Sequence, residues 1–196
     1  YIEGRQVKMQ SVRDAQENGI SIIHQELVLV PYMTVAENIF LGREPVNAMG
    51  MVDQDRMIKE AQEMLDSFEL HIRADSRLGT LTTANQQMVE IIKAISFNSK
   101  ILVMDEPTSS LSEKEVDYLF QTIRKLKKKG VGIIYISHRM SELNEISDRI
   151  TVLRDGTYIG TRITSQTDQS ELISMMVGRE LHKYYTRTYN DSDETV

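Results

Sequence analysis

Hydrophobic positions along the chain follow two different spacings, and their alternation predicts an α/β fold. Three short runs are apolar at nearly every position: 20–23, 101–104 and 131–136. Such runs are typical of parallel strands that are covered on both faces of a sheet. Longer stretches between them repeat their apolar residues every three or four positions, as amphipathic helices do. The sequence therefore predicts a mainly parallel sheet with helices packed on it.

The clearest helical stretch is 53–68, where one helical face carries the apolar residues Met57, Ala61, Met64, Leu65 and Phe68. Further helices are expected at 11–19, within 27–42, and over 86–97, 112–129 and 169–177. The stretch Leu81–Asn85 is expected to lead into the helix at 86–97. Near the end of the chain, Asp155-Gly156 lies between two strand-like stretches and predicts a C-terminal β-hairpin over 149–161.

Length and charge narrow the classes of function. The chain has 196 residues, enough for one domain with a substantial core. Its net charge of −6 gives no general attraction to nucleic acid or to anionic lipid. It contains no cysteine, which excludes disulfides and thiolate metal sites within it. No apolar run approaches the roughly 20 residues that span a bilayer, and the polar stretch 182–196 predicts a linker.

Polar side chains follow each of the three predicted strands. Gln25 comes after the first strand, Asp105 and Glu106 after the second, and His138 after the third. Parallel strands bring their carboxyl ends to one edge of the sheet, where ligands bind in open α/β proteins, so these side chains are expected to converge. Two adjacent carboxylates there could handle a metal ion and an attacking water. Taken singly, each residue fits an ordinary solvated position at least as well.

A second candidate is the stretch 81–85, which feeds the amino terminus of a predicted helix. Free backbone N–H groups, the helix dipole and the hydroxyls of Thr82 and Thr83 would favour an anion there. Helix starts of this kind are common, so this one does not establish a binding site by itself.

The order of these motifs resembles an ATP-binding-cassette (ABC) ATPase between its Q-loop and its H-loop. The residues that carry the resemblance are Gln25, Leu81–Asn85, Ile101–Pro107, Ser109–Ser112 and His138. Four further stretches resemble, more narrowly, the ATPase subunits of bacterial ribose, galactose and xylose importers: 24–27, 34–44, 85–91 and 176–181. The similarity covers residues 1–181 and implies a P-loop NTPase-like cassette with a helical subdomain at about 27–97.

The resemblance implies a role for each strand-end residue. Asp105 would hold Mg²⁺, and Glu106 would polarise the water that attacks the γ-phosphate of ATP. His138 would contact that phosphate and link it to Glu106, and Gln25 would complete the shell around the metal and the water.

Two other motifs are implied to act between two cassettes. The signature residues would contact nucleotide held by the opposite cassette; they are Thr82, Thr83, Ala84 and Asn85. The stretch Ser109–Ser112 would form the neighbouring D-loop, so Ser109 and Ser112 are also implied to lie near nucleotide.

The sequence departs from the family pattern at three places. No Gly-x-x-x-x-Gly-Lys-Ser/Thr phosphate loop (Walker A) occurs in it, so we expect a cassette fragment that begins after that loop and is inactive alone. The signature reads Leu-Thr-Thr-Ala-Asn where Leu-Ser-Gly-Gly-Gln is common, which removes the close backbone approach that glycines allow. The D-loop ends in Ser112 where Asp is usual.

The resemblance implies the ATP-binding subunit of a monosaccharide importer, an ATP hydrolase using ATP and Mg²⁺ at the cytoplasmic face of the bacterial cell membrane. Its partners would be the permease subunits, a second cassette beyond the linker 182–196 and, indirectly, a sugar-binding protein; no nucleic acid is expected. Two alternatives remain: a docking module in which the stretch Met33–Gly42 and the helical region after it present an apolar surface to a permease, and a non-transport cassette ATPase.

Overall fold

The structure of the protein is a computed structural model that describes residues 1–178. The predicted linker at 182–196 and the end of the predicted 1–181 domain lie outside the described residues. The chain divides into two compact units, 1–138 and 139 onward, and each is treated by itself. Within residues 1–178, no helix combines the length and the apolar character that crossing a bilayer requires.

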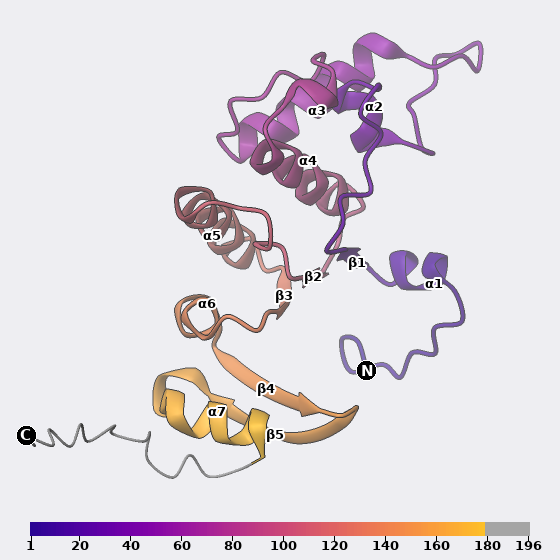
Figure 1. The fold of residues 1–196 in the computed structure, drawn as a ribbon. Coiled ribbons are helices and arrows are strands. Elements are labelled where there is room, and N and C mark those ends of the chain that lie inside the picture. The colour runs from indigo at the N-terminus through magenta and orange to yellow at the C-terminus, as the bar shows by residue number, and fades with distance from the viewer. Residues whose placement is uncertain (179–196) are drawn as a thin grey trace, which may run out of the picture. The chain divides into compact units, whose positions relative to one another are not determined.

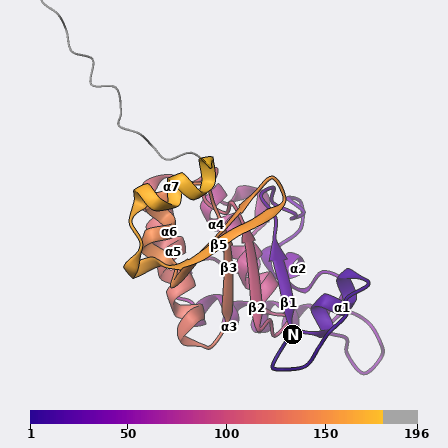
Figure 2. The ribbon, with the colours of Figure 1, turned by 90° about the horizontal axis from the view of Figure 1, so that it is seen from below.

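The first unit is built on a parallel sheet of three strands, which confirms the predicted arrangement. β1 (Ile20–Ile23), β2 (Ile101–Asp105) and β3 (Gly132–Ile136) lie side by side in that order (Figure 2). The register pairs Ile23 with Met104 and Met104 with Tyr135. Because all three strands run the same way, the residues that follow them emerge at one edge of the sheet.

The expectation that both faces of this sheet are buried is wrong. Ile23, Leu102 and Met104 are fully buried, but Ile22 is 48% exposed and Ile134 is 53% exposed on the opposite face. The buried face is covered by two helices, α4 (Thr83–Ile95) against β1 and α5 (Glu113–Lys128) against β3. Strand runs that are apolar throughout cannot reveal which face the helices cover, because both faces carry the same kind of side chain.

The remaining helices of the first unit include α1 (Val12–Glu17), α2 (Val35–Phe40) and α3 (Gln54–Ser67), followed by a short 3₁₀ helix, η1 (Leu78–Thr80). The helices α2, α3 and α4 form one cluster, with α2 packed on both others (Figure 1). These helices carry fully buried apolar side chains such as Val35, Ile39, Met57, Leu65 and Met88.

An apolar surface was expected over Met33–Gly42 and the region after it; the first part is wrong, because α2 turns its apolar side chains into the core, whereas apolar side chains are exposed after Gly42. Val35, Ala36 and Ile39 are fully buried, and within Met33–Gly42 only Leu41 is appreciably exposed among the large apolar residues. Near α2 in the sequence, the exposed apolar side chains precede or follow the helix: Tyr32 before it, and Val46, Met49, Met51 and Val52 after it.

The helix expected at 86–97 begins three residues earlier. Thr82 caps α4 by accepting a hydrogen bond from the Asn85 N–H (3.3 Å), so Thr83, Ala84 and Asn85 form the first helical turn. A threonine with an extended backbone at this position stabilises a helix start by about 1 kcal/mol. The stretch 81–85 is therefore largely helical and not a loop.

The second unit contains the predicted hairpin. β4 (Arg149–Arg154) pairs antiparallel with β5 (Thr157–Ile163), and both turn residues, Asp155 and Gly156, have positive φ angles. α7 (Gln169–Val177) packs on β4 and ends at Gly178, as expected (Figure 1). Two elements were not expected, namely α6 (Met140–Ile146) and the 3₁₀ helix η2 (Thr164–Gln166).

The one-sided burial of the sheet predicts unequal effects of two neighbouring substitutions. Ile23→Ala should lower the free energy of unfolding by about 2–5 kcal/mol, because it leaves a cavity in the core. Ile22→Ala should cost less than about 1 kcal/mol, since its side chain is half exposed. Urea unfolding of both variants measures the difference, and equal losses would contradict it.

Candidate active site

The carboxyl ends of the three strands bring together three of the predicted site residues. The carboxylate of Glu106 lies between the other two: Gln25 Nε2 is 3.4 Å from Glu106 Oε2, and His138 Nδ1 is 2.9 Å from Glu106 Oε1. These residues are separated by 81 and 32 positions in the chain. The parallel sheet, and no local motif, therefore creates this cluster.

The backbone at Glu106 is unusual for a residue with a side chain. Its φ angle is +44°, in the left-handed region that disfavours residues other than glycine. The conformation is held on both sides, because the Glu106 N–H donates to the Ile136 carbonyl (3.0 Å) and the Glu106 carbonyl accepts from the Ser109 N–H (3.2 Å). Strain of this kind costs on the order of 1–3 kcal/mol and is concentrated at functional sites.

The two residues of the closest contact in the site differ in their exposure to solvent. The His138 side chain is 70% exposed, whereas that of Glu106 is 29% exposed. In the tautomer with its proton on Nδ1, His138 donates to Glu106 and leaves Nε2 as an acceptor. A half-buried carboxylate oriented by two neighbours can accept a proton from a bound water, which is the task of a general base.

The donor set suits Mg²⁺ in chemical type. Asp105 is the last residue of β2 and directly precedes Glu106, and Gln25 supplies an amide oxygen in addition to the Nε2 that it gives to Glu106. Mg²⁺ prefers oxygen ligands and typically uses one or two carboxylates together with phosphate and water. The described part of the chain holds no cluster of three or more His, Asp or Glu ligands that could form an all-protein metal cage.

The signature residues make their own contacts at the start of α4. Thr82 and Thr83 are exposed and Asn85 is partly exposed, but Ala84 is only 6% exposed. The Asn85 N–H is used by the Thr82 hydroxyl, so it is not one of the free N–H groups expected there. None of these four residues bonds to the cluster around Glu106.

The two D-loop serines also have local partners. The Ser109 N–H closes the turn at Glu106, as described above. Ser112 begins α5 through the predicted capping box, with its N–H and its hydroxyl both donating to the Glu115 carboxylate (2.8 and 2.7 Å). Ser112 therefore stabilises a helix start, whatever further role it has.

A set of buried polar residues near Gln25 was missed by sequence reasoning. Beyond Gln25 the chain is held by side chains: the Val28 N–H donates to Glu90 Oε1 (3.3 Å), and the Val28 carbonyl accepts from Lys93 Nζ (3.4 Å). Asn38 binds both polar groups of the Val30 peptide (2.7 and 3.0 Å). The sequence did carry one signal of these contacts: Glu90 is a charged residue within the otherwise apolar run 88–92, which suggests a buried polar partner.

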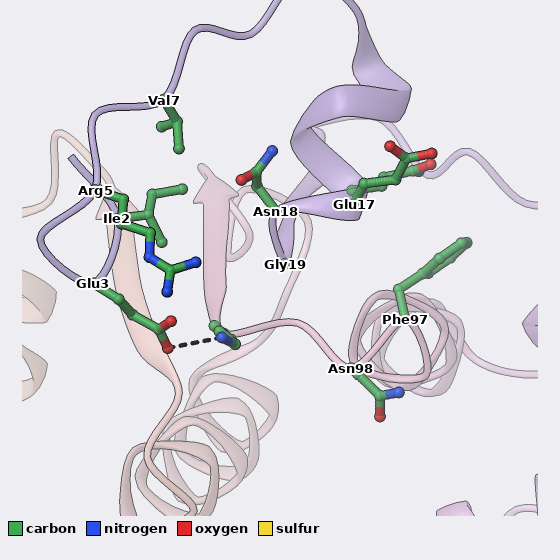
Figure 3. A pocket seen from close by; sticks show the side chains of 11 residues that line it. Ile2, Glu3, Arg5, Val7, Glu17, Asn18, Gly19, Phe97 and Asn98 are labelled. Atoms are coloured by element: carbon green, nitrogen blue, oxygen red, sulfur yellow. Dashed lines mark hydrogen bonds and ion pairs between the residues drawn. The ribbon is translucent and has the colours of Figure 1, made fainter.

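A cavity of about 340 Å³ lies away from these residues, near the amino ends of the strands. It is bordered by Gly19 and Lys100, which precede β1 and β2, and by the opening segment of the chain. The ion pair between Glu3 Oε1 and Lys100 Nζ (2.7 Å) spans one side of it (Figure 3). The cavity therefore contains none of the predicted site residues.

The burial of Glu90 predicts a pH dependence of stability. Removal from water raises the pKa of its carboxyl above the ordinary value of 4.5, against smaller opposing effects of the Val28 N–H, Lys93 and His24. A carboxyl with a raised pKa in the folded protein contributes most stability below its unfolded pKa, and that contribution is lost as the pH rises through the folded value. Relative to Glu90→Gln, the wild-type protein should therefore become less stable from about pH 4 toward neutrality. Urea unfolding of both proteins over this pH range tests the prediction, and a difference in unfolding free energy that does not change with pH would contradict it.

Comparison with known proteins agrees with the motif order. A profile of the ABC transporter family matches residues 1–109. A protein of Halalkalibacterium halodurans, provisionally named a ribose/galactose/methyl galactoside import ATP-binding protein, is 54% identical over 94% of this chain and 36% of its own length. The galactose/methyl galactoside import ATP-binding protein MglA of Salmonella typhimurium is 46% identical over 99% of this chain and 38% of its own length. The chain thus spans a little over a third of these relatives.

Solved structures show the same fold. One ATP-binding cassette of an ABC transporter aligns with a TM-score of 0.69 at 24% identity, over 84% of this chain and 69% of its own. Another, a dimeric cassette in a post-hydrolysis state with ADP and phosphate, aligns with a TM-score of 0.64 at 24% identity, over 80% and 68%. With more than half of its residues matched by the family profile, the chain belongs to the ABC transporter family.

Proposed function

We propose that this chain contributes the hydrolytic residues of the ATP-binding subunit of a carbohydrate importer, which couples ATP hydrolysis to monosaccharide uptake. The observation that carries the proposal is the placement of the Glu106 carboxylate between Gln25 and His138, directly after Asp105. The substrate class rests on the relatives, whose names assign them to import of ribose, galactose or methyl galactoside.

The proposed division of roles follows from the environment of each group. Glu106 is the general base that takes a proton from the attacking water, because it is half buried and oriented by two neighbours. His138, with its exposed ring, contacts the γ-phosphate and keeps Glu106 in place. Asp105 and Gln25 hold Mg²⁺, which when bound supplies positive charge to the phosphate oxygens.

The signature and D-loop residues are proposed to act across a cassette dimer. Thr82, Thr83 and Asn85 can offer side chains to nucleotide on a second cassette, whereas Ala84 can act only through its backbone because its methyl group is buried. Ser109 and Ser112 belong to the adjoining turn. We place the second cassette in the same gene product, beyond a linker at 182–196, with residues 1–181 as part of the first.

The proposed location is the cytoplasmic face of the cell membrane, where the subunit would bind the permease as a peripheral protein. A sugar-binding protein would act on the subunit indirectly, through the permease. A non-transport cassette that acts on DNA or ribosomes is a weaker candidate. The net charge of −6 disfavours contact with nucleic acid, and the named relatives are import proteins.

The role of Glu106 is tested by Glu106→Gln in the complete gene product. The amide has nearly the same shape but cannot accept a proton, so ATP turnover should fall by about 10²–10⁴-fold. Binding of a fluorescent ATP analogue in the presence of Mg²⁺ should be unchanged. Glu113→Gln, an exposed residue of α5, serves as the control and should keep full turnover. Wild-type turnover by Glu106→Gln would refute the assignment.

A second candidate function, docking of a permease, is favoured by a separate observation. Apolar side chains are exposed in the segment between α2 and α3: Val46 is 55% exposed, Met49 78% and Met51 56%. Flexible methionines adapt to varied apolar partners. This surface and the site at Glu106 can serve one protein, so docking adds to ATP hydrolysis and does not replace it.

The docking surface is tested by replacing Met49 and Met51 together with serine in the complete gene product. Co-purification with the permease should fall at least tenfold, while ATP binding in the absence of the permease should not change. Val12→Ser removes an apolar side chain that is 73% exposed on α1 and should have no effect. Undiminished co-purification of the double variant would rule out this surface.

A further inference from the structure

The segment that leaves β1 and carries Gln25 lacks a neighbouring strand over residues 28–30, and side chains take the place of one. At Val28, the N–H is bound by Glu90 and the carbonyl by Lys93, both from α4. At Val30, both groups are bound by Asn38 of α2. The polar groups of two alternate residues, Val28 and Val30, are thus bound by side chains, and the chain after Gln25 is held against two helices.

Burying the Glu90 carboxylate costs free energy, and no hydrogen bond within α4 offsets that cost. The residue is 6% exposed, and its Oε2 is buried with no hydrogen-bond partner. Burial also lowers the pKa of Lys93, so both charged groups are held at a desolvation penalty. Within the described residues, the one hydrogen bond of the Glu90 carboxylate is with the Val28 N–H, so the contribution that offsets this penalty lies in the chain that it holds.

The held residue lies close to the site. Val28 follows Gln25 by three positions, and three residues span at most about 10 Å. The contact of Gln25 with Glu106 is long, at 3.4 Å, and so are the two contacts that hold Val28, at 3.3 and 3.4 Å, so the position of Gln25 depends on all three together. The position of Val28 therefore limits where the Gln25 side chain can lie.

We propose that Glu90 and Lys93 are positioning residues, which clamp the Val28 peptide and thereby set Gln25 against Glu106 for ATP hydrolysis. The inference rests on the proposed function. Neither residue touches the cluster itself; each acts through the backbone between Val28 and Gln25. Losing the clamp leaves Gln25 chemically intact but free to move away from Glu106.

The test is a double-mutant cycle in the complete gene product, with kcat and KM for ATP measured separately. Glu90→Ala should lower kcat about tenfold with KM changed less than twofold, since the clamp acts on the hydrolytic step. In a Gln25→Ala background, Glu90→Ala should cause no further loss, because the side chain that it positions is gone. Glu90→Gln keeps an oxygen for the Val28 N–H and should restore kcat to within about twofold.

The matched control is Gln87→Ala. Gln87 is 3% exposed on the same helix, and its Nε2 is buried without a hydrogen-bond partner, so the substitution makes a similar cavity without freeing Val28. It should leave kcat within twofold of wild type. Lys93→Met, which keeps an unbranched side chain one atom shorter but removes the bond to the Val28 carbonyl, repeats the test at a less buried position and should lower kcat about threefold.

The outcomes separate the two proposals. Additive losses from Glu90→Ala and Gln25→Ala, or an equal loss in Gln87→Ala, would reduce Glu90 to a structural role and overturn the inference while Glu106→Gln still abolishes turnover. Full turnover in Glu106→Gln would instead overturn the proposed function, and the positioning role with it. If Glu90→Ala does not fold, Lys93→Met in the two backgrounds decides between additivity and its absence.

Discussion

The parallel pairing of β1, β2 and β3 is the constraint on which the site depends. Gln25, Glu106 and His138 are distant in sequence and meet only because three strands end at the same edge. Parallel strands require long crossover connections, and here those connections are the helical cluster and α5. The site thus comes together only when the three strands pair, which requires the helical connections between them to be folded as well.

The helical cluster does more than connect β1 to β2. α4 packs on the sheet through Ala94, whose carbonyl accepts from the Ser21 hydroxyl (3.2 Å), and the same helix binds the segment after Gln25. Its first turn carries the signature residues. One rigid element therefore joins the strand that precedes the site, the loop that carries Gln25 and the surface proposed to meet a second cassette. A displacement of α4 would be felt at all three.

Much of this arrangement was predictable, because strand and helix periods and capping residues are local signals. The strand ends, the capping box at Ser112 and the Asp155-Gly156 hairpin all follow from neighbouring residues. Other features depend on distant packing. The open face at Ile22 and Ile134 could not be inferred from runs that are apolar on both faces. The early start of α4 depended on which threonine became the cap, and the clamp on Val28 joins residues 62 positions apart.

The two adjacent acids at the end of β2 take up different positions, which suit the two different roles proposed for them. Asp105 still follows the pleat and pairs with Ile136, so it belongs to the open face of the sheet, opposite to buried Met104. Glu106 leaves the pleat through its positive φ angle, and its carboxylate then lies between Gln25 and His138. A regular continuation of the strand would have returned residue 106 to the face of Met104, toward the core. The left-handed turn at Glu106 therefore separates a residue suited to hold a metal ion from one suited to act as a base, and this explains why backbone strain is tolerated at that position.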